Sequence, residues 1–168
     1  MGLDAITPND FKLLRDYIER HCGILLGDEK AYLVETRLAG LLAETGCRDY
    51  GSLYRLAISE TGTELRDKIV DAMTTNETLW FRDGHPFQIL REVLLPEFGQ
   101  QLLKGQRFRI RIWSAAASTG QEPYSIAMTI LEYCREHPGI QPTQFEILAS
   151  DISPSALFLA KAGRYDEG

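Results

Sequence analysis

Small residues follow a strand-like segment in the second half of the chain, in a pattern typical of ligand-binding loops. Residues Arg107–Trp113 alternate polar and apolar side chains, which is the period of a strand. The next residues, Ser114–Gly120, include three alanines and leave the backbone accessible to a ligand. A turn and then a helix, with Pro123 near its start, are predicted over Ser118–Glu136, and the N-terminus of that helix would point at such a ligand. The same run of small residues is also typical of a closely packed turn between a strand and a helix.

Two carboxylates accompany this loop in the predicted fold. Asp151 follows the apolar segment Phe145–Ser150, and an acid at the end of a second strand is well placed to accept hydrogen bonds from ribose hydroxyls. Glu122 lies at the start of the predicted helix, where the helix dipole stabilises a carboxylate in any protein. An acid at this position favours a cationic ligand, such as a sulfonium, over a phosphate. Asp151 can alternatively cap the helix that follows it.

A polar cluster, Thr74–Asp83, precedes these elements. It runs directly from Thr75-Asn76-Glu77-Thr78 into Leu79-Trp80-Phe81-Arg82, which is unusual for a solvated linker. Polar side chains at such a junction are well placed to line a cleft between domains. The alternative interpretation is a capped turn followed by a pair of core aromatic residues.

Other classes of site lack support in the sequence. Neither GxGxxG nor GxxxxGK occurs, which argues against an NAD-type oxidoreductase and against a phosphate-loop enzyme. A net charge of −6 and a pI near 5.1 argue against a nucleic-acid partner. The 3 cysteines form no CxxC pair, so we expect packing roles in a reducing compartment, and no metal site is predicted. With no secretory leader and no apolar run of roughly 20 residues, we expect a cytoplasmic protein without membrane insertion.

Residues 1–84 are predicted to form a small N-terminal helical bundle and a linker. Thr7-Pro8 is typical of a helix start, and Phe11, Leu14 and Ile18 then recur at helical spacing. Further helices are predicted over residues 28–45, 52–59 and 63–73, the first of them ending at Gly46.

Residues 85–168 are predicted to form part of an α/β domain. A helix over Pro86–Leu103 is expected to present one apolar face, made of Phe87, Leu90, Leu94, Phe98 and Leu102. Strand, helix, strand and a final helix over Pro154–Ala162 then give a βαβα order, which implies a parallel sheet. Two such strands leave open edges. We therefore expect either a fragment of a longer protein or a chain that pairs with another, including a dimer through the sheet edge.

Three motifs in this order resemble the bacterial chemotaxis receptor methyltransferase family, CheR. They are Thr74–Arg82, Arg111–Ser125 and Ala149–Ser153, and the similarity extends from Cys22 to Tyr165. The resemblance implies a helical domain followed by a class I (Rossmann-like) S-adenosylmethionine-dependent methyltransferase domain. It also implies an enzyme that methylates glutamate side chains on the cytoplasmic helices of chemoreceptors.

The same resemblance implies roles for particular residues. Arg82 lies near the reacting end and is the one catalytic candidate. A glutamate substrate is ionised at neutral pH because its unperturbed pKa is about 4.3, so that no general base is needed. The residues expected to bind the cofactor S-adenosylmethionine are Asn76, Thr78, Arg82, Ala116, Glu122 and Asp151.

The sequence departs from the family pattern in three respects. Gln121 replaces a glutamate, which we expect to affect cofactor binding little. The second helix, associated with receptor docking, keeps Lys30 and Arg37 but also carries Glu35 and Glu44. Family members also extend further, so we expect weak or absent cofactor binding and no turnover by residues 1–168 alone. The alternative function is a catalytically silent module that binds receptors or other partners.

Overall fold

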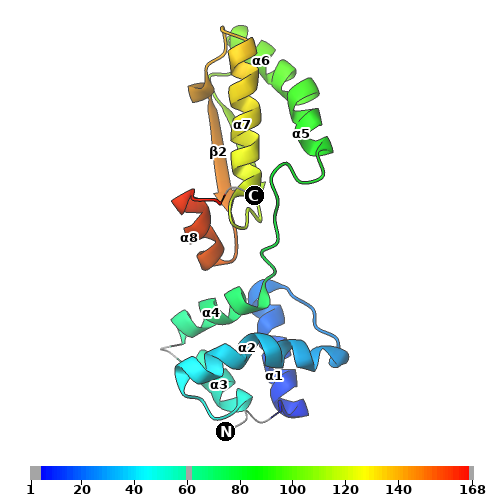
Figure 1. The fold of residues 1–168 in the computed structure, drawn as a ribbon, viewed down its shortest axis with the longest axis vertical. Helices are drawn as coiled ribbons and strands as arrows, with labels where there is room; N and C mark the ends of the chain where they lie inside the picture. Colours follow the sequence, from blue (N-terminus) through cyan, green and yellow to red (C-terminus); the bar gives the residue numbers. More distant parts are fainter. Residues whose placement is uncertain (1–4, 60–61, 167–168) are drawn as a thin grey trace. The chain divides into compact units, whose positions relative to one another are not determined.

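The computed structural model describes residues 5–59 and 62–166, which fold into two compact units (Figure 1). The first unit comprises Met1–Thr75 with Ile152–Pro154, and the second comprises Asn76–Asp151 with Ser155–Gly168. The first is helical and the second is α/β, as predicted. The predicted boundary at residue 84 followed a change in sequence character, whereas the contacts assign residues 76–84 to the second unit.

The helical unit is built from amphipathic helices around one core. Thr7 caps the first helix by accepting a hydrogen bond from the Asp10 amide at 3.1 Å, with Pro8 in the first turn as predicted. Gly46, with φ 69°, ends the second main helix in the left-handed conformation. The helices are α1 (Pro8–Cys22), η1 (Asp28–Lys30), α2 (Ala31–Thr45), α3 (Tyr50–Ala57) and α4 (Thr63–Met73). The core includes Leu14, Ile18, Leu38, Leu42, Leu53 and Ile69.

The second unit is built around a parallel pair of strands, as the βαβα order predicts. β1 (Ile110–Ala115) lies beside β2 (Phe145–Ser150), with Ile110 opposite Phe145 and Ala115 opposite Ser150. In Figure 1, α7 lies along β2. The segment from α5 to α6 packs against α7 on the side away from β2. The helices are α5 (His85–Ile89), η2 (Leu90–Leu94), α6 (Leu95–Leu103), α7 (Gln121–Glu136), η3 (Pro142–Gln144) and α8 (Pro154–Ala162).

The two faces of the sheet differ in burial. One face joins α7 in a core that includes Ile110, Ile112, Ile126, Ile130, Tyr133 and Ile147. On the opposite face Trp113 and Leu148 are exposed, at 68% and 64%. The alternation of side chains along a strand produces this difference, because successive residues point to opposite faces.

Several element boundaries differ from the predicted ones: α3, for example, spans Tyr50–Ala57 where residues 52–59 were predicted. The first strand begins at Ile110 and not at Arg107, because β2 begins at Phe145 and offers no partner to the earlier residues. Within the turn and helix predicted over Ser118–Glu136, the turn extends to Gly120, whose φ of 100° departs from the helical path, and the helix begins at Gln121.

The predicted helix over residues 86–103 contains a π-helical turn, η2, that shifts its buried face. The Leu95 amide donates to the Leu90 carbonyl, five residues back, so that one extra residue enters this turn. Pro96 follows directly and has no amide to donate, which favours such a departure from the α-helical ladder. As a result Leu95 is fully buried at 0%, whereas Leu94, the residue predicted for the core, is 37% exposed. The prediction for Leu94 was wrong.

The shifted face can be tested by paired substitutions. We expect Leu95→Ala to lower the free energy of unfolding of the second unit by about 2–5 kcal/mol, as for other fully buried leucines. Leu94→Ala should cost less than about 1 kcal/mol. Urea denaturation followed by tryptophan fluorescence reports on this unit, because Trp80 and Trp113 both lie in it. Equal effects of the two substitutions would contradict the shifted register.

Candidate functional site

The loop between β1 and α7 turns at two residues that are not glycine. Ala116 has φ 59° and Ser118 has φ 50°, in the left-handed region that such residues rarely adopt. Strained residues of this kind persist where their surroundings fix them, and they cluster at functional sites. Here β2 and its end fix the loop. The Ala117 amide donates to the Ser150 carbonyl at 2.9 Å, and the Ser118 amide donates to Asp151 Oδ2 at 2.7 Å.

Asp151 lies where the predicted fold needs an acid. It is half-buried directly after β2, and the parallel pairing brings it beside the end of β1. Ligands of open α/β sheets bind at this edge, outside the carboxyl ends of the strands. Its carboxylate therefore has a place at the ligand edge and, at the same time, holds the loop through the Ser118 amide.

Ser118 also joins the loop to the polar cluster that precedes α5. Its hydroxyl donates to the main-chain carbonyl of Asn76 at 2.9 Å, and the residue is only 6% exposed. Two of the predicted cofactor residues thus bond one serine, Asp151 through its carboxylate and Asn76 through its main-chain carbonyl. The sequence reasoning missed Ser118, although its position among the small residues of the loop was a usable signal.

Arg82 and Glu122 line a separate cavity of about 310 Å³. Glu122 Oε1 accepts a hydrogen bond at 2.7 Å from the hydroxyl of Ser114, a buried residue of β1. Arg82 donates to the Glu77 carbonyl at 3.2 Å, and within the described ranges it forms no ion pair with a carboxylate. Arg82 and Glu122 therefore line one cavity without forming an ion pair with each other. The other lining residues are Asp83, Pro86, Phe87, Leu90, Ile112 and Ile126.

The backbone around Arg82 is unusual in the same way as the loop. Phe81 has φ 49° and Asp83 has φ 64°, so that left-handed residues stand on both sides of the arginine. The Phe81 amide donates to the hydroxyl of Ser125 at 3.1 Å, and the Phe81 and Phe87 rings meet edge-on at 5.2 Å. These contacts fasten the segment to α7 and α5. Phe81 is anchored by these contacts, but it is 43% exposed and does not belong to the core.

Thr78 and Gln121 neither bond Ser118 nor line the cavity that contains Arg82 and Glu122. Thr78 is half-buried, and in the part of the chain that the structure describes its side chain makes no hydrogen bond. Gln121 Oε1 accepts a hydrogen bond from the hydroxyl of Thr119 at 2.7 Å. A glutamate oxygen would accept the same bond, which is consistent with the small effect expected of this departure from the family pattern.

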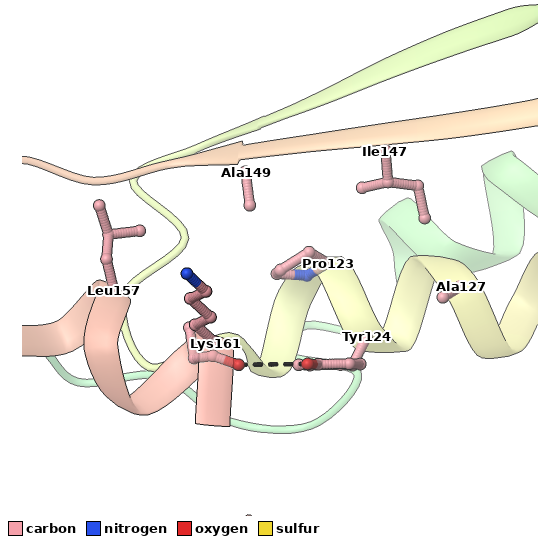
Figure 2. Close-up of a pocket in the computed structure, with 8 residues that line it drawn as sticks. Pro123, Tyr124, Ala127, Ile147, Ala149, Leu157 and Lys161 are labelled. Atoms are coloured by element: carbon pink, nitrogen blue, oxygen red, sulfur yellow. Dashed lines mark hydrogen bonds between the residues drawn. The ribbon is translucent and has the colours of Figure 1, made fainter. Parts of the chain in front are cut away.

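A larger pocket, of about 440 Å³, lies elsewhere on the second unit. Figure 2 shows it between α7, β2 and α8, with the Lys161 side chain pointing into it. None of the six predicted cofactor residues lines it. Its walls are mostly apolar, from Pro123, Tyr124, Ala127, Ile147, Ala149, Leu157 and Ala160. The larger of the two pockets is therefore not the one that the predicted polar residues line.

Metal and membrane sites receive no support from the described residues. No group of histidine, cysteine, aspartate and glutamate side chains among them is arranged to hold a metal ion. The described helices include none with the length and apolar character to cross a membrane. Cys22, Cys47 and Cys134 are free thiols that pack against the two cores, as predicted.

Arg37, a candidate for receptor docking, has a structural task in the helical unit. Its guanidinium donates to the carbonyls of Met73 and Thr74 at the end of α4, and to the Thr75 hydroxyl at 3.0 Å. A cation at a helix C-terminus interacts favourably with the exposed carbonyls. This side chain is therefore occupied within its own unit.

The residues present fit the S-adenosylmethionine that the family resemblance implies. Ala116 presents no side chain beyond a methyl group at the turn of the loop, and it is exposed. Asp151 offers a carboxylate at the ligand edge, and Glu122 offers an exposed acid in the first turn of α7. No phosphate-binding feature competes with this arrangement in the loop, which suits a cationic ligand.

The contact between Asp151 and the loop can be tested without any ligand. We expect Asp151→Ala to accelerate hydrogen exchange of the Ser118 amide about 10–100-fold, because a hydrogen bond to a charged acceptor contributes about 1.5–3 kcal/mol. The neighbouring Ala117 amide, which donates to a main-chain carbonyl, is the internal control and should change much less. Exchange measured by NMR would contradict the assignment if both amides responded equally.

Comparison with known proteins places this geometry in a family. Residues 76–168 match the CheR methyltransferase SAM binding domain, and residues 9–74 match the CheR methyltransferase all-alpha domain. The chain is 47% identical over 162 residues to the chemotaxis protein methyltransferase of Vibrio anguillarum, covering 96% of this chain and 57% of that protein. It is 48% identical over 160 residues to chemotaxis protein methyltransferase 1 of Pseudomonas aeruginosa, covering 94% and 56%.

A more distant relative is the chemotaxis protein methyltransferase of Escherichia coli, 34% identical over 161 residues, with 96% of this chain and 52% of that protein covered. The chain spans about half the length of the curated relatives it matches. The dimer expected through the sheet edge receives no support from these comparisons. The two domain matches cover most of the sequence, and the chain therefore belongs to the CheR methyltransferase family, with its all-alpha domain and its S-adenosylmethionine-binding domain in sequence.

Proposed function

We propose that the protein is a protein-glutamate O-methyltransferase, which transfers a methyl group from S-adenosylmethionine to glutamate side chains of chemoreceptors. The observation that supports this most directly is that Ser118 bonds both the Asp151 carboxylate and the Asn76 main-chain carbonyl at the carboxyl ends of the strands. The relatives named as chemotaxis protein methyltransferases support the same reaction class. The proposed substrate is the cytoplasmic helices of chemoreceptors, which gives the protein a proposed cytoplasmic location.

The proposed roles combine what the family resemblance implies with the contacts described above. Asp151 accepts hydrogen bonds from ribose hydroxyls, and Ala116 leaves room for the ligand beside the loop. Glu122 faces the cationic part of the ligand with an acid that is already held by the Ser114 hydroxyl. Asn76 and Thr78 line the same ligand from the linker. When bound, S-adenosylmethionine supplies an electrophilic methyl group on a positively charged sulfur.

Arg82 is the proposed catalytic residue. Its guanidinium shares a cavity with Glu122 and is not bridged to a described carboxylate, so it is available to orient an incoming glutamate. That substrate is ionised at neutral pH and attacks without a general base. The work of the protein is then alignment and exclusion of water, and positioning alone supplies about 7–11 kcal/mol in well-oriented reactions.

This proposal is tested by methyl transfer in a form of the protein that has the length of its relatives. With a chemoreceptor cytoplasmic fragment as substrate, we expect base-labile methyl esters on glutamate. Arg82→Gln should lower kcat by about 100–1,000-fold, as for removal of other transition-state donors. Asp151→Ala should raise the KM for the cofactor about 10-fold or more.

Glu122→Gln has a matched control on the same helix. Glu122→Gln should weaken cofactor binding, because it removes the negative charge that faces the sulfonium. Glu132→Gln removes an exposed acid that lies 3.8 Å from Arg91, and it should leave turnover unchanged. Absence of methyl ester from the unsubstituted protein with several receptor fragments would refute the proposed reaction.

A second candidate function is a partner-binding module without catalysis. The helical unit supports it, because residues from α1 to α4 close their own core. We expect saturable binding of the 168-residue chain to a receptor fragment, measured by calorimetry without S-adenosylmethionine, if this function holds. Docking through Arg37 is disfavoured, since that side chain already bonds the end of α4. Methyl ester formation by the same chain would exclude the silent form.

A further inference from the structure

Tyr165 occupies a position that neither the sequence motifs nor the proposed reaction explains. It follows α8 and lies half-buried against residues from two distant parts of the second unit. Its ring meets the Trp80 ring edge-on, with 4.8 Å between the centroids. Its hydroxyl donates to the main-chain carbonyl of Thr119 at 2.7 Å. Burial raises the pKa of the Tyr165 hydroxyl, and the neighbouring Tyr124 adds to this, so the group remains a hydrogen-bond donor at neutral pH.

The contact with the loop is tight. A Cβ added at Gly120 would lie 2.6 Å from the Tyr165 hydroxyl and 2.9 Å from Cβ of Ala160. Gly120 also has φ 100°, which residues with a side chain rarely adopt. The tyrosine hydroxyl therefore lies directly on the backbone at the end of the loop, where α7 begins.

The two partners of Tyr165 belong to the two segments that carry the site. Trp80 stands two residues before Arg82 in the linker motif. Thr119 directly follows Ser118, which bonds both Asp151 and the Asn76 carbonyl. One side chain thus touches the segment with the cation and the loop with the cofactor residues.

We propose that Tyr165 is a positioning residue, which holds the Trp80 end of the linker motif against the end of the Ser114–Gly120 loop. Through these two contacts it fixes the spacing between Arg82 on the motif and Asp151 beneath the loop. The consequence for the enzyme rests on the proposed function, whereas the positioning itself does not. Tyr165 does not belong to the core cluster of the second unit, and besides these two segments it meets the Tyr124 ring on α7.

Tyr124 provides a matched comparison in the same aromatic group. Its ring meets the Tyr165 ring edge-on at 5.8 Å, and its hydroxyl donates to the Ala160 carbonyl at 3.1 Å (Figure 2). This bond joins α7 to α8 and touches neither the loop carbonyl nor Trp80. Removal of the Tyr124 hydroxyl therefore removes a hydrogen bond of the same chemical kind from a different place.

The experiment compares Tyr165→Phe, Tyr165→Leu and Tyr124→Phe in a Trp113→Phe background, where Trp80 is the single tryptophan. In the 168-residue chain we expect Tyr165→Phe to retain the Trp80 emission. The same substitution should speed hydrogen exchange of the Gly120 amide, which shares a peptide group with the Thr119 carbonyl, about 3–10-fold, because one neutral hydrogen bond is lost. Tyr165→Leu should also shift the Trp80 emission to longer wavelength. Tyr124→Phe should change neither reading.

The same variants are then measured as enzymes in a form with the length of the relatives. Tyr165→Phe should raise the KM for the cofactor more than it lowers kcat, whereas Tyr165→Leu should lower kcat as well, because the Arg82 segment is released. Emission and exchange that match the parent in both Tyr165 variants would overturn the proposal. If Tyr165→Leu fails to fold, Tyr165→Phe alone decides the matter. Failure of methyl transfer by the parent would refute the proposed function and leave the emission and exchange results to judge Tyr165.

Discussion

The parallel pairing of β1 with β2 is the constraint on which the site depends. Because the two strands run in the same direction, Ala115 lies opposite Ser150, and the residues that follow each strand leave the sheet at the same edge. Only this arrangement lets the Asp151 carboxylate reach the Ser118 amide, although the two residues are 33 positions apart in the sequence. An antiparallel pair would carry the acid to the opposite end of the loop-bearing strand. The chemistry of the loop is thus a consequence of strand direction.

Strand direction alone does not place the linker motif, Thr74–Arg82, beside the loop. That step needs side chains that bond main-chain atoms, with Ser118 holding the Asn76 carbonyl and Ser125 holding the Phe81 amide. Both serines are almost completely buried, at 6% and 0% exposure. A buried hydroxyl must find partners, so these bonds are strongly specified by the fold. The motif is therefore fastened at two points by serines that lie outside it.

The architecture and the location of the site could be predicted from sequence, because they rest on local periodicity and on small residues at strand ends. The βαβα order, the first helix cap and the stop at Gly46 are of this kind. What could not be predicted depends on contacts between distant segments. Leu95 is buried in place of Leu94 because a π-helical turn precedes Pro96. The first strand begins at Ile110 because its partner strand begins at Phe145.

The site shows the same division between local and distant information. The presence of Asp151 and the loop residues could be read from their order, but the left-handed backbone of Ala116 and Ser118 has no signature in side-chain type. Likewise, Arg37 looks like a surface cation in the sequence, and only the fold reveals its bonds to the end of α4. Whether the six predicted residues contact the cofactor stays a prediction.

The main-chain anchoring of the linker motif has an evolutionary consequence. Since the bonds from Ser118 and Ser125 engage the carbonyl of residue 76 and the amide of residue 81, they do not discriminate among side chains at those positions. These two bonds therefore tolerate a change of side chain, whereas the ring contacts of Trp80 with Tyr165 and of Phe81 with Phe87 do not. In evolution, a substitution at residue 76 changes the side chain that the motif offers to a ligand and leaves the bond from Ser118 to the main-chain carbonyl in place.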